Sequence, residues 1–185
     1  MQRPSRLVYD GHMGEAPDLA YTVFPTAWGP MAAVARGGEL TRVFLPYYQA
    51  DDIEAMLRFE HPGAGRSDDA FENFVQRCRA YFNGQAVTFD DIACRLPGEA
   101  SFAGKVLRAC RAVPHGQTTS YGQLAKQIGR PDAARAVATA LSKNPTPLVI
   151  PCHRVTYADG RPGGFSAPAG PALKQRLLDL ESRAR

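Results

Sequence analysis

The stretch NPTPLVIPCHRV, residues 144–155, places a cysteine directly before a histidine in a segment that prolines constrain. Proline disfavours the helical conformation for the residue before it, and the apolar run 148–150 then predicts a short buried strand. Pro151 has no N–H to donate to a ladder and should end that strand. We therefore expect Cys152 to lie where a buried strand gives way to irregular backbone, a place where a rigid scaffold often holds reactive groups.

The Cys152–His153 pair has two interpretations, because a free cysteine is more often a small core residue than a nucleophile. Reactivity requires the thiolate, and a thiol with a pKa of about 8.5 is mostly protonated at neutral pH. His153 is a candidate base and Arg154 adds positive charge, but neighbours in sequence do not necessarily face each other. The pair alone leaves both interpretations open. The remaining cysteines have no histidine beside them and are interpreted as structural: Cys78, Cys94 and Cys110.

Two short helices are predicted before this segment. Ser120 and Gln123 have the spacing of a capping box, in which the hydroxyl and the amide each satisfy a backbone N–H group. Gly129 is a suitable C-terminal stop for the first helix. The second helix is predicted over residues 132–144, with Asp132 as its cap.

This arrangement has the proportions of a helix-turn-helix, in which two helices flank a tight glycine-containing turn. Arg135 lies near the N-terminal end of the second helix, where such helices meet DNA. An αα-hairpin that only packs against its neighbours would show the same pattern. DNA binding is therefore one of two interpretations of the pattern.

The first half of the chain predicts a small sheet with a covering helix. Residues 21–36 and 39–47 are predicted to form strands, joined by a hairpin-type turn at Gly37 and Gly38. Residues 69–84 carry apolar side chains at helical spacing and predict the covering helix.

A breaker at Pro97 and Gly98 separates this half from a helix predicted over residues 101–113. The prediction is an α+β protein with two domains. Residues 1–98 would form an N-terminal α/β structural domain, and residues 99–185 a mostly helical, winged-helix-like domain with the helix-turn-helix.

The charge is distributed unevenly between the two halves. Residues 1–100 carry 9 Lys/Arg and 14 Asp/Glu, a net charge of −5, while residues 101–185 carry 13 and 4, a net charge of +9. This asymmetry favours a polyanionic partner for the second half, although an ordinary solvated basic face would look the same.

The overall composition, 44% apolar and 22% charged over 185 residues, is that of an ordinary globular protein. No apolar run approaches the ~18 residues needed to span a membrane, and the N-terminus lacks the apolar core of a secretory signal. We expect a cytoplasmic protein with a short, loose N-terminal tail and no membrane partner. No C-x-x-C pair occurs and the histidines are scattered, so we expect neither a metal site nor a disulfide framework.

The run RAV-x6-NP-x-P-x3-PCHRV, followed by GGFS and an LLDLE helix, resembles the O6-alkylguanine-DNA alkyltransferase family. The resemblance covers residues 99–185 in detail. It implies that Cys152 accepts the alkyl group from guanine O6 in one irreversible, single-turnover step without a cofactor. His153, acting through a water molecule and oriented by Glu181, would be the base, and Asn144 the hinge residue before the active-site segment. The charge of these groups would favour the Cys152 thiolate.

The resemblance also implies that the protein, as a monomer, binds double-stranded DNA in the minor groove and rotates the lesion out of the stack. Such a protein would be cytoplasmic or nucleoid-associated. Arg135 would fill the vacated space, and Tyr121 would press on the phosphate. The other implied positions are Ala136, Ala138 and Thr139 at the DNA, and Tyr121, Val155, Phe165 and Ser166 at the guanine. Ala138 and Thr139 stand where the family has glycines, and Phe165 where many members have tyrosine.

Two other classes of function are compatible with parts of the sequence. A DNA-binding module that senses lesions without repairing them would need no acceptor, and the presence of Cys152 argues against it. A Cys-His hydrolase unrelated to DNA would not explain Arg135, Tyr121 or the basic second half.

Overall fold

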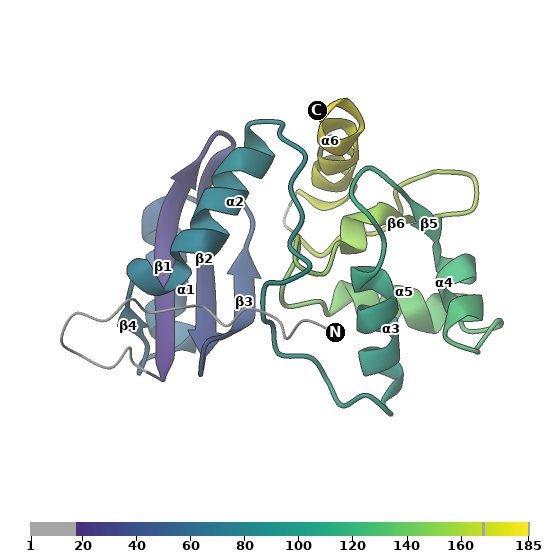
Figure 1. Ribbon diagram of the computed structural model, residues 1–185, viewed down its shortest axis with the longest axis horizontal. Coiled ribbons are helices and arrows are strands. Elements are labelled where there is room, and N and C mark those ends of the chain that lie inside the picture. Colours follow the sequence, from purple (N-terminus) through teal and green to yellow (C-terminus); the bar gives the residue numbers. More distant parts are fainter. Residues whose placement is uncertain (1–17, 168, 185) are drawn as a thin grey trace. The chain divides into compact units, whose positions relative to one another are not determined.

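The computed structural model describes residues 18–167 and 169–184 (Figure 1). The chain divides into two compact units, Met1–Arg95 and Leu96–Arg185. The predicted division after residue 98 falls in the same connecting segment, and the predicted N-terminal tail, residues 1–17, lies outside the described residues. The predicted α+β class is confirmed, with a small sheet in the first unit and mostly helices in the second. No described helix combines the length and the apolar character needed to cross a membrane.

The first unit is built on a four-stranded sheet in the order β3-β2-β1-β4. The antiparallel strands are β1 (Leu19–Thr26), β2 (Gly29–Arg36) and β3 (Glu39–Phe44), and the short β4 (Gly65–Arg66) pairs parallel to β1.

The prediction of a single strand over residues 21–36 is wrong, because the chain turns back between β1 and β2. Thr26 pairs with Gly29 across this two-residue turn, and its hydroxyl donates to the Gly29 carbonyl. Gly29 has a φ of +130°, a conformation that suits glycine. The turn residues Ala27 and Trp28 are apolar, so the sequence lacked the usual polar signal of a hairpin.

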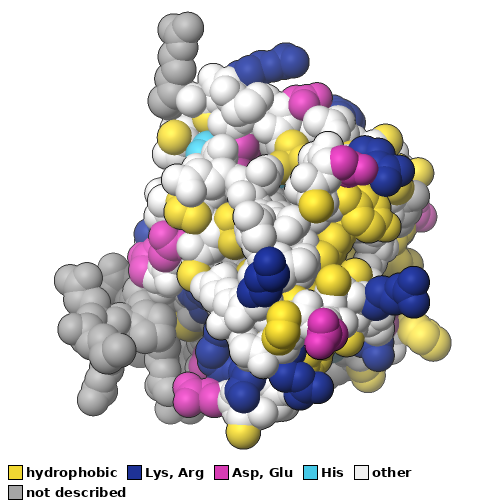
Figure 2. Space-filling model, turned by 90° about the vertical axis from the view of Figure 1, so that its right-hand side faces the viewer, with side chains coloured by type: hydrophobic (Ala, Val, Ile, Leu, Met, Phe, Trp, Pro, Cys, Tyr) yellow, Lys and Arg dark blue, Asp and Glu magenta, His cyan; other side chains and the backbone are white. Residues whose placement is uncertain are grey.

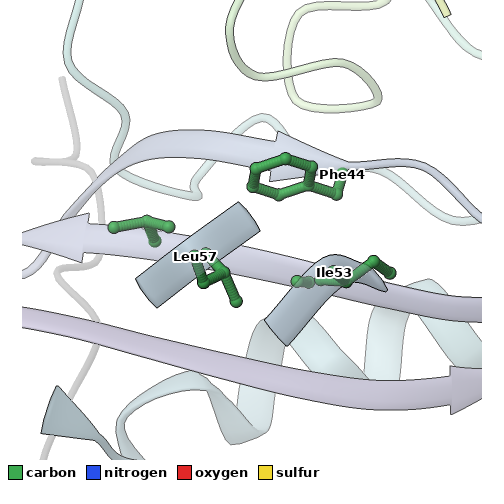
Figure 3. Packing of buried hydrophobic residues seen from close by; sticks show 5 residues of the cluster. Phe44, Ile53 and Leu57 are labelled. Carbon is green, nitrogen blue, oxygen red and sulfur yellow. The ribbon is translucent and has the colours of Figure 1, made fainter. Parts of the chain in front are cut away.

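Helices cover both faces of this sheet, α1 (Ala50–Glu60) on one and α2 (Glu72–Phe82) on the other (Figure 1). Alternate side chains of β1 point to opposite faces, as the two-residue period of a strand requires. Phe24 packs against Phe74 of α2 with ring centroids 6.2 Å apart. On the α1 face, Figure 3 shows side chains of a core cluster made of Ala32, Val34, Phe44, Ile53 and Leu57.

The helix predicted over residues 69–84 is confirmed as a short 3-10 turn, Asp69–Phe71, followed by α2. The predicted covering helix is α2, and α1 is an additional helix that no sequence pattern indicated. α1 buries only Ile53 and Leu57 completely, so its apolar periodicity is too weak to stand out from the surrounding acidic residues.

The second unit packs α3 (Phe102–Arg111), α4 (Tyr121–Gln127) and α5 (Ala134–Ser142) against one another. The last helix, α6 (Gly170–Arg183), contacts a 3-10 turn, η2 (Cys152–Arg154). The core of this unit contains side chains that are at most 2% exposed: Val106, Leu124, Ala125, Val137, Ile150 and Leu177.

Two end signals of α4 are confirmed. The Ser120 hydroxyl accepts from the Gln123 N–H at 3.1 Å, and the Gln123 side chain accepts from the Ser120 N–H at 2.8 Å. At the other end, Gly129 has a φ of +75° and the N–H of Arg130 donates to the carbonyl of Ala125. This pattern is a Schellman motif, which ends the helix at a left-handed glycine.

The predicted cap of α5 is wrong. The helix begins at Ala134 after Ala133, which provides no side-chain hydrogen bond, and Asp132 lies outside it. The N–H of Ala133 instead donates to the carbonyl of Arg130, so a turn occupies the position where Asp132 was expected to cap.

The predicted buried strand over residues 148–150 is also wrong, although these residues are buried. Leu148 has a φ of +73°, which is incompatible with a strand, and the N–H of Ile150 donates back to the carbonyl of Thr146. The prolines of this segment favour a turn rather than extended pairing. Strand structure appears only after the cysteine, where β6 (Val155–Thr156) pairs parallel to β5 (Thr119–Ser120).

Gly104 of α3 is a position at which a side chain does not fit. An added Cβ would collide with the carbonyl oxygen of Gly98 and lie 2.8 Å from that of Pro97. Because both obstacles are backbone atoms, Gly104→Ala should lower the free energy of unfolding by about 1–3 kcal/mol. Urea unfolding followed by circular dichroism measures this change.

The matched control is Gly122→Ala in α4, where the nearest atom to the new Cβ is Ser120 Oγ at 3.9 Å. This variant should be as stable as the parent protein or more stable by up to about 1 kcal/mol, because alanine favours helix over glycine. Unchanged stability of Gly104→Ala would contradict the packing described for α3.

Candidate active site

Cys152 opens the η2 turn and has 7% of its residue surface exposed. Its Sγ accepts a hydrogen bond from Asn144 Nδ2 at 3.2 Å. The same amide nitrogen donates to the Ile150 carbonyl at 2.8 Å, and Asn144 Oδ1 accepts from the Thr146 N–H at 3.1 Å. These bonds fix the orientation of the Asn144 amide, so that its NH2 group, rather than its oxygen, faces the Cys152 sulfur.

The adjacent His153 is fully buried, and its Nε2 lies 2.7 Å from Glu181 Oε1. Arg154 contacts the same carboxylate, with Nε 2.9 Å from Oε2 and Nη2 3.0 Å from Oε1. The N–H of Gly116 donates to Oε2 at 3.0 Å. Arg154 Nη1 also donates to the Val113 carbonyl at 2.7 Å. Glu181 of α6 thus binds both η2 and the loop that leads from α3 to β5.

The charge states in this cluster follow from these contacts. Burial by itself would raise the pKa of Glu181, but the hydrogen bonds from His153 and Arg154 outweigh it and hold the pKa well below its usual range. Burial lowers the pKa of His153, and Glu181 opposes this effect only in part. At neutral pH the carboxylate is therefore ionised and the imidazole is neutral.

The thiol of Cys152 differs from the expectation that nearby charge favours the thiolate. Burial raises the pKa of Cys152, although the hydrogen bond from Asn144 and the positive charge of Lys174 act in the opposite direction. Arg154 directs its guanidinium to Glu181, so that positive charge is already neutralised. The thiol is therefore protonated at neutral pH.

Lys174 is a buried residue that the sequence analysis missed. Its side chain is almost fully enclosed, and Nζ donates to the Val155 carbonyl at 2.6 Å and to the Tyr121 hydroxyl at 3.1 Å. Burial lowers the pKa of Lys174 to about 8. A signal was present in the sequence, because Lys174 shares the inward stripe of α6 with Leu177 and Glu181 at spacings of three and four residues.

Tyr121, the first residue of α4, lies beside this lysine with 8% of its surface exposed. The Lys174 ammonium is 5.3 Å from the centroid of its ring. Burial, with a further contribution from Tyr157, raises the pKa of Tyr121 to about 12. Its hydroxyl is therefore a neutral group at physiological pH.

Comparison with known proteins identifies the family. The family model described as the 6-O-methylguanine DNA methyltransferase DNA-binding domain matches residues 101–183. A methylated-DNA–protein-cysteine methyltransferase of Mycobacterium bovis is 43% identical over 90% of this chain and 94% of its own. One from Methanosarcina acetivorans is 36% identical over 88% of this chain and 98% of its own.

The chain belongs to the methylated-DNA–protein-cysteine methyltransferase family. Solved structures agree with this assignment. The crystal structure of Mycobacterium tuberculosis O6-methylguanine methyltransferase is similar with a TM-score of 0.71 and 33% identity, over 90% of this chain and 95% of that one. The crystal structure of Mycobacterium tuberculosis OGT in complex with DNA gives 0.73 and 34%, over 89% and 94%. The general role of this methyltransferase is DNA repair.

Most of the other predicted site residues of this methyltransferase lie on helix α5 or in the loop before α6, outside the buried cluster around Glu181. Arg135, Ala136 and Thr139 are exposed on α5, and Ala138 is half-buried. The Thr139 hydroxyl donates to the carbonyl of Arg135 one turn earlier, so its polar atom is engaged within the helix. Figure 2 shows one face of the molecule, on which many of the Lys and Arg side chains gather in the lower half, with hydrophobic, Asp and Glu side chains among them.

Phe165 and Ser166 lie in the loop before α6. Phe165 is half-buried, and the Ser166 hydroxyl donates to the carbonyl of Ser142 at the end of α5. The predicted substrate contact through Val155 concerns its backbone, and the Val155 carbonyl already accepts from Lys174. Among the described residues, no group of His, Cys, Asp and Glu side chains is arranged to hold a metal ion.

Glu181→Gln should strongly destabilise this methyltransferase at neutral pH, because it removes the only negative charge described beside the buried Arg154 guanidinium. The expected loss is about 3–5 kcal/mol of unfolding free energy, measured by urea unfolding. Because the pKa of Glu181 is lower in the folded protein than in the unfolded chain, its contribution is complete above about pH 4.3 and is lost as the pH falls further. The difference between variant and parent should therefore shrink in acid.

Asp179→Asn on the same helix is the control, since the Asp179 carboxylate accepts a hydrogen bond only from the exposed Gln175 amide among the described residues. Its effect should stay within about 0.5 kcal/mol. A difference between Glu181→Gln and the parent that does not depend on pH would show that the charge of Glu181 is not what stabilises the cluster.

Proposed function

We propose that this chain transfers an alkyl group from O6 of guanine in DNA to Sγ of Cys152, and that each molecule acts once. The observation that carries the proposal is the thiol itself, which lies under the Asn144 amide and next to the buried His153–Glu181 pair. The names of the curated relatives state that the acceptor is a cysteine of the protein.

Cys152 is favoured over the other cysteines as the acceptor. Cys78 and Cys94 lie in the first unit, outside the residues that the family model matches. Cys110 lies within that region, but its side chain has no exposed surface, and burial raises its pKa well above the ordinary value. Cys152 retains some exposure and has a donor that stabilises the negative charge developing on sulfur.

The chemistry is a displacement at the alkyl carbon. The S–C bond forms as the C–O6 bond breaks, and the bonding electrons pass to the guanine ring, which then takes up a proton. The thiol proton passes by way of a water molecule to His153. Glu181 accepts a hydrogen bond from Nε2–H, which leaves Nδ1 as the basic nitrogen, and its negative charge stabilises the imidazolium. The product is a thioether, which no group in the site can cleave, so the protein is consumed.

We also propose that α4 and α5 bind the minor groove of double-stranded DNA as a helix-turn-helix, with the protein as a monomer. Arg135 would occupy the space left by the extruded guanine and pair with the orphaned cytosine, while Tyr121 would displace the phosphate. Ala136, Ala138 and Thr139 would approach the DNA backbone. The exposure of Arg135 at the start of α5 supports this role.

The guanine would lie against the Val155 carbonyl, the Phe165 ring and Ser166, with Tyr121 at the pocket wall. Lys174 supports the proposal by holding both the Tyr121 hydroxyl and the Val155 carbonyl in place. A protein that repairs chromosomal DNA acts where the DNA is, so we expect it in the cytoplasm or at the nucleoid.

Cys152→Ala should abolish transfer while DNA binding persists, because only the acceptor sulfur is removed. The protein is incubated with a duplex that carries O6-methylguanine, and its intact mass is measured. The parent protein should gain the mass of one methyl group, located on Cys152 by peptide mapping, and the variant should gain none. Binding without any mass gain in the parent would indicate a lesion sensor, and continued product formation in excess of the protein would indicate a hydrolase.

Arg135→Ala should slow repair of the duplex by about tenfold or more, which corresponds to about 1.4 kcal/mol of activation free energy. Reaction with the free O6-alkylguanine base should be unchanged, because a free base does not have to be extruded. Lys143→Ala removes a positive charge at the other end of the same helix and serves as the control. Equal losses on duplex and free base would count against the proposed role of Arg135.

A further inference from the structure

The short parallel pair β5–β6 places two tyrosines side by side at the wall of the candidate site. Thr119 pairs with Val155 and Ser120 with Thr156, so the next residues along the two strands are Tyr121 and Tyr157. Their rings meet edge to face, with centroids 5.5 Å apart. Tyr121 is buried, whereas Tyr157 is 49% exposed and forms the outer member of the pair.

Tyr157 begins a turn that backbone hydrogen bonds hold in one shape. The N–H of Gly160 donates to the carbonyl of Tyr157 at 3.0 Å, and the N–H of Tyr157 donates to the carbonyl of Arg161 at 2.9 Å. Gly160 has a φ of +82°, which the turn requires. After the turn, Gly163 packs so closely that an added Cβ would lie 2.8 Å from the Tyr121 hydroxyl and 3.3 Å from the Tyr157 ring.

Arg161 is presented outward from this turn. Its guanidinium carbon lies 5.5 Å from the centroid of the Tyr157 ring, and its side chain is 76% exposed. Asp159 Oδ2 accepts from Arg161 Nε at 2.7 Å, and Asp159 Oδ1 accepts from the Arg161 N–H at 3.1 Å. Asp159 thus orients the guanidinium through one edge. Both terminal nitrogens have no hydrogen-bond partner among the residues that the structure describes.

A guanidinium with its two terminal nitrogens free offers the planar, two-pronged donor geometry that matches a phosphate group. Stacking on Tyr157 and the bonds to Asp159 reduce the entropy that Arg161 would lose on binding. The position next to Tyr121 sets which phosphate is within reach, because Tyr121 is proposed to act at the extruded nucleotide.

We propose that Arg161, held by Tyr157 and Asp159, binds a DNA backbone phosphate next to the nucleotide that carries the lesion. This contact would be separate from the α4–α5 surface and would fix the DNA strand at the mouth of the pocket. The choice of phosphate rests on the proposed function of Tyr121. The contact itself requires only that the second unit binds DNA.

The decisive variant is the double substitution Arg161→Gln with Asp159→Asn, which leaves the net charge of the protein unchanged. Its affinity for an undamaged duplex is measured at several salt concentrations. Loss of one phosphate contact should reduce the slope of log affinity against log salt by about 0.9, because about that many counterions per phosphate are no longer released. Arg161→Lys keeps the charge, so the slope should stay near that of the parent while the affinity falls.

Arg183→Gln is the matched control, since Arg183 is exposed on α6 and has no ion pair among the described residues. It changes the net charge without removing the proposed contact, so its slope should match that of the parent. An unchanged slope in the double variant would overturn the proposal, as would an equal decrease in Arg183→Gln. Failure of the proposed function is seen separately, because a parent protein that gains no mass from O6-methylguanine DNA could still show the predicted difference in slope.

Discussion

The second unit depends on the hydrogen bonds and the ion pair that the buried carboxylate of Glu181 forms. This carboxylate accepts hydrogen bonds from Arg154 and from the N–H of Gly116, and it lies within hydrogen-bond distance of His153. Burying charges is costly, and such a cluster persists only when the opposite charges are well paired and the remaining donors and acceptors are satisfied. Here Arg154 meets the carboxylate through two nitrogens and uses a third for the Val113 carbonyl. One residue of the last helix therefore fixes both the turn that carries the cysteine and the loop that leads into α4.

The same arrangement explains why the Cys152 thiol is protonated although it accepts a hydrogen bond from Asn144. Because Arg154 is neutralised by Glu181, its charge has little effect on the thiol, and burial decides the protonation state of Cys152. Asn144 contributes a donor whose direction is fixed by the backbone of residues 146 and 150. A thiolate that was exposed at rest would react with any electrophile or oxidant, since reactivity follows thiolate character and access.

Small elements have large effects in this unit. The strands β5 and β6 have two residues each, yet their register brings Tyr121 of the helix-turn-helix next to Tyr157 of the segment after the cysteine. Lys174 then joins Tyr121 to the Val155 carbonyl from the side of α6. Helix α4, the segment that follows Cys152 and the last helix α6 thus share one set of contacts. A displacement of any one of these segments would therefore change the positions of the other two.

Features that arise from short-range interactions could be predicted from the amino-acid sequence. The capping box at Ser120, the stop at Gly129 and the apolar stripe of the helix over residues 72–82 involve partners within one or two turns, and their residue types reveal them. The motif around Cys152 was specific enough to indicate the family. Predictions were wrong where the local pattern was weak or misleading. The turn at Ala27 and Trp28 was missed because both residues are apolar, and the apolar run at 148–150 does not form the predicted strand.

Contacts between residues far apart in the sequence became visible only in the three-dimensional structure. Gly116 and Glu181 are 65 residues apart, and Tyr121 and Lys174 are 53 residues apart, so no local pattern links them. The protonation states of Cys152, His153 and Lys174 likewise depend on burial, which is a property of packing rather than of neighbouring letters. Caps, helix ends and apolar stripes depend on residues close together in the sequence. Contacts between distant segments depend on how several elements pack together around one core.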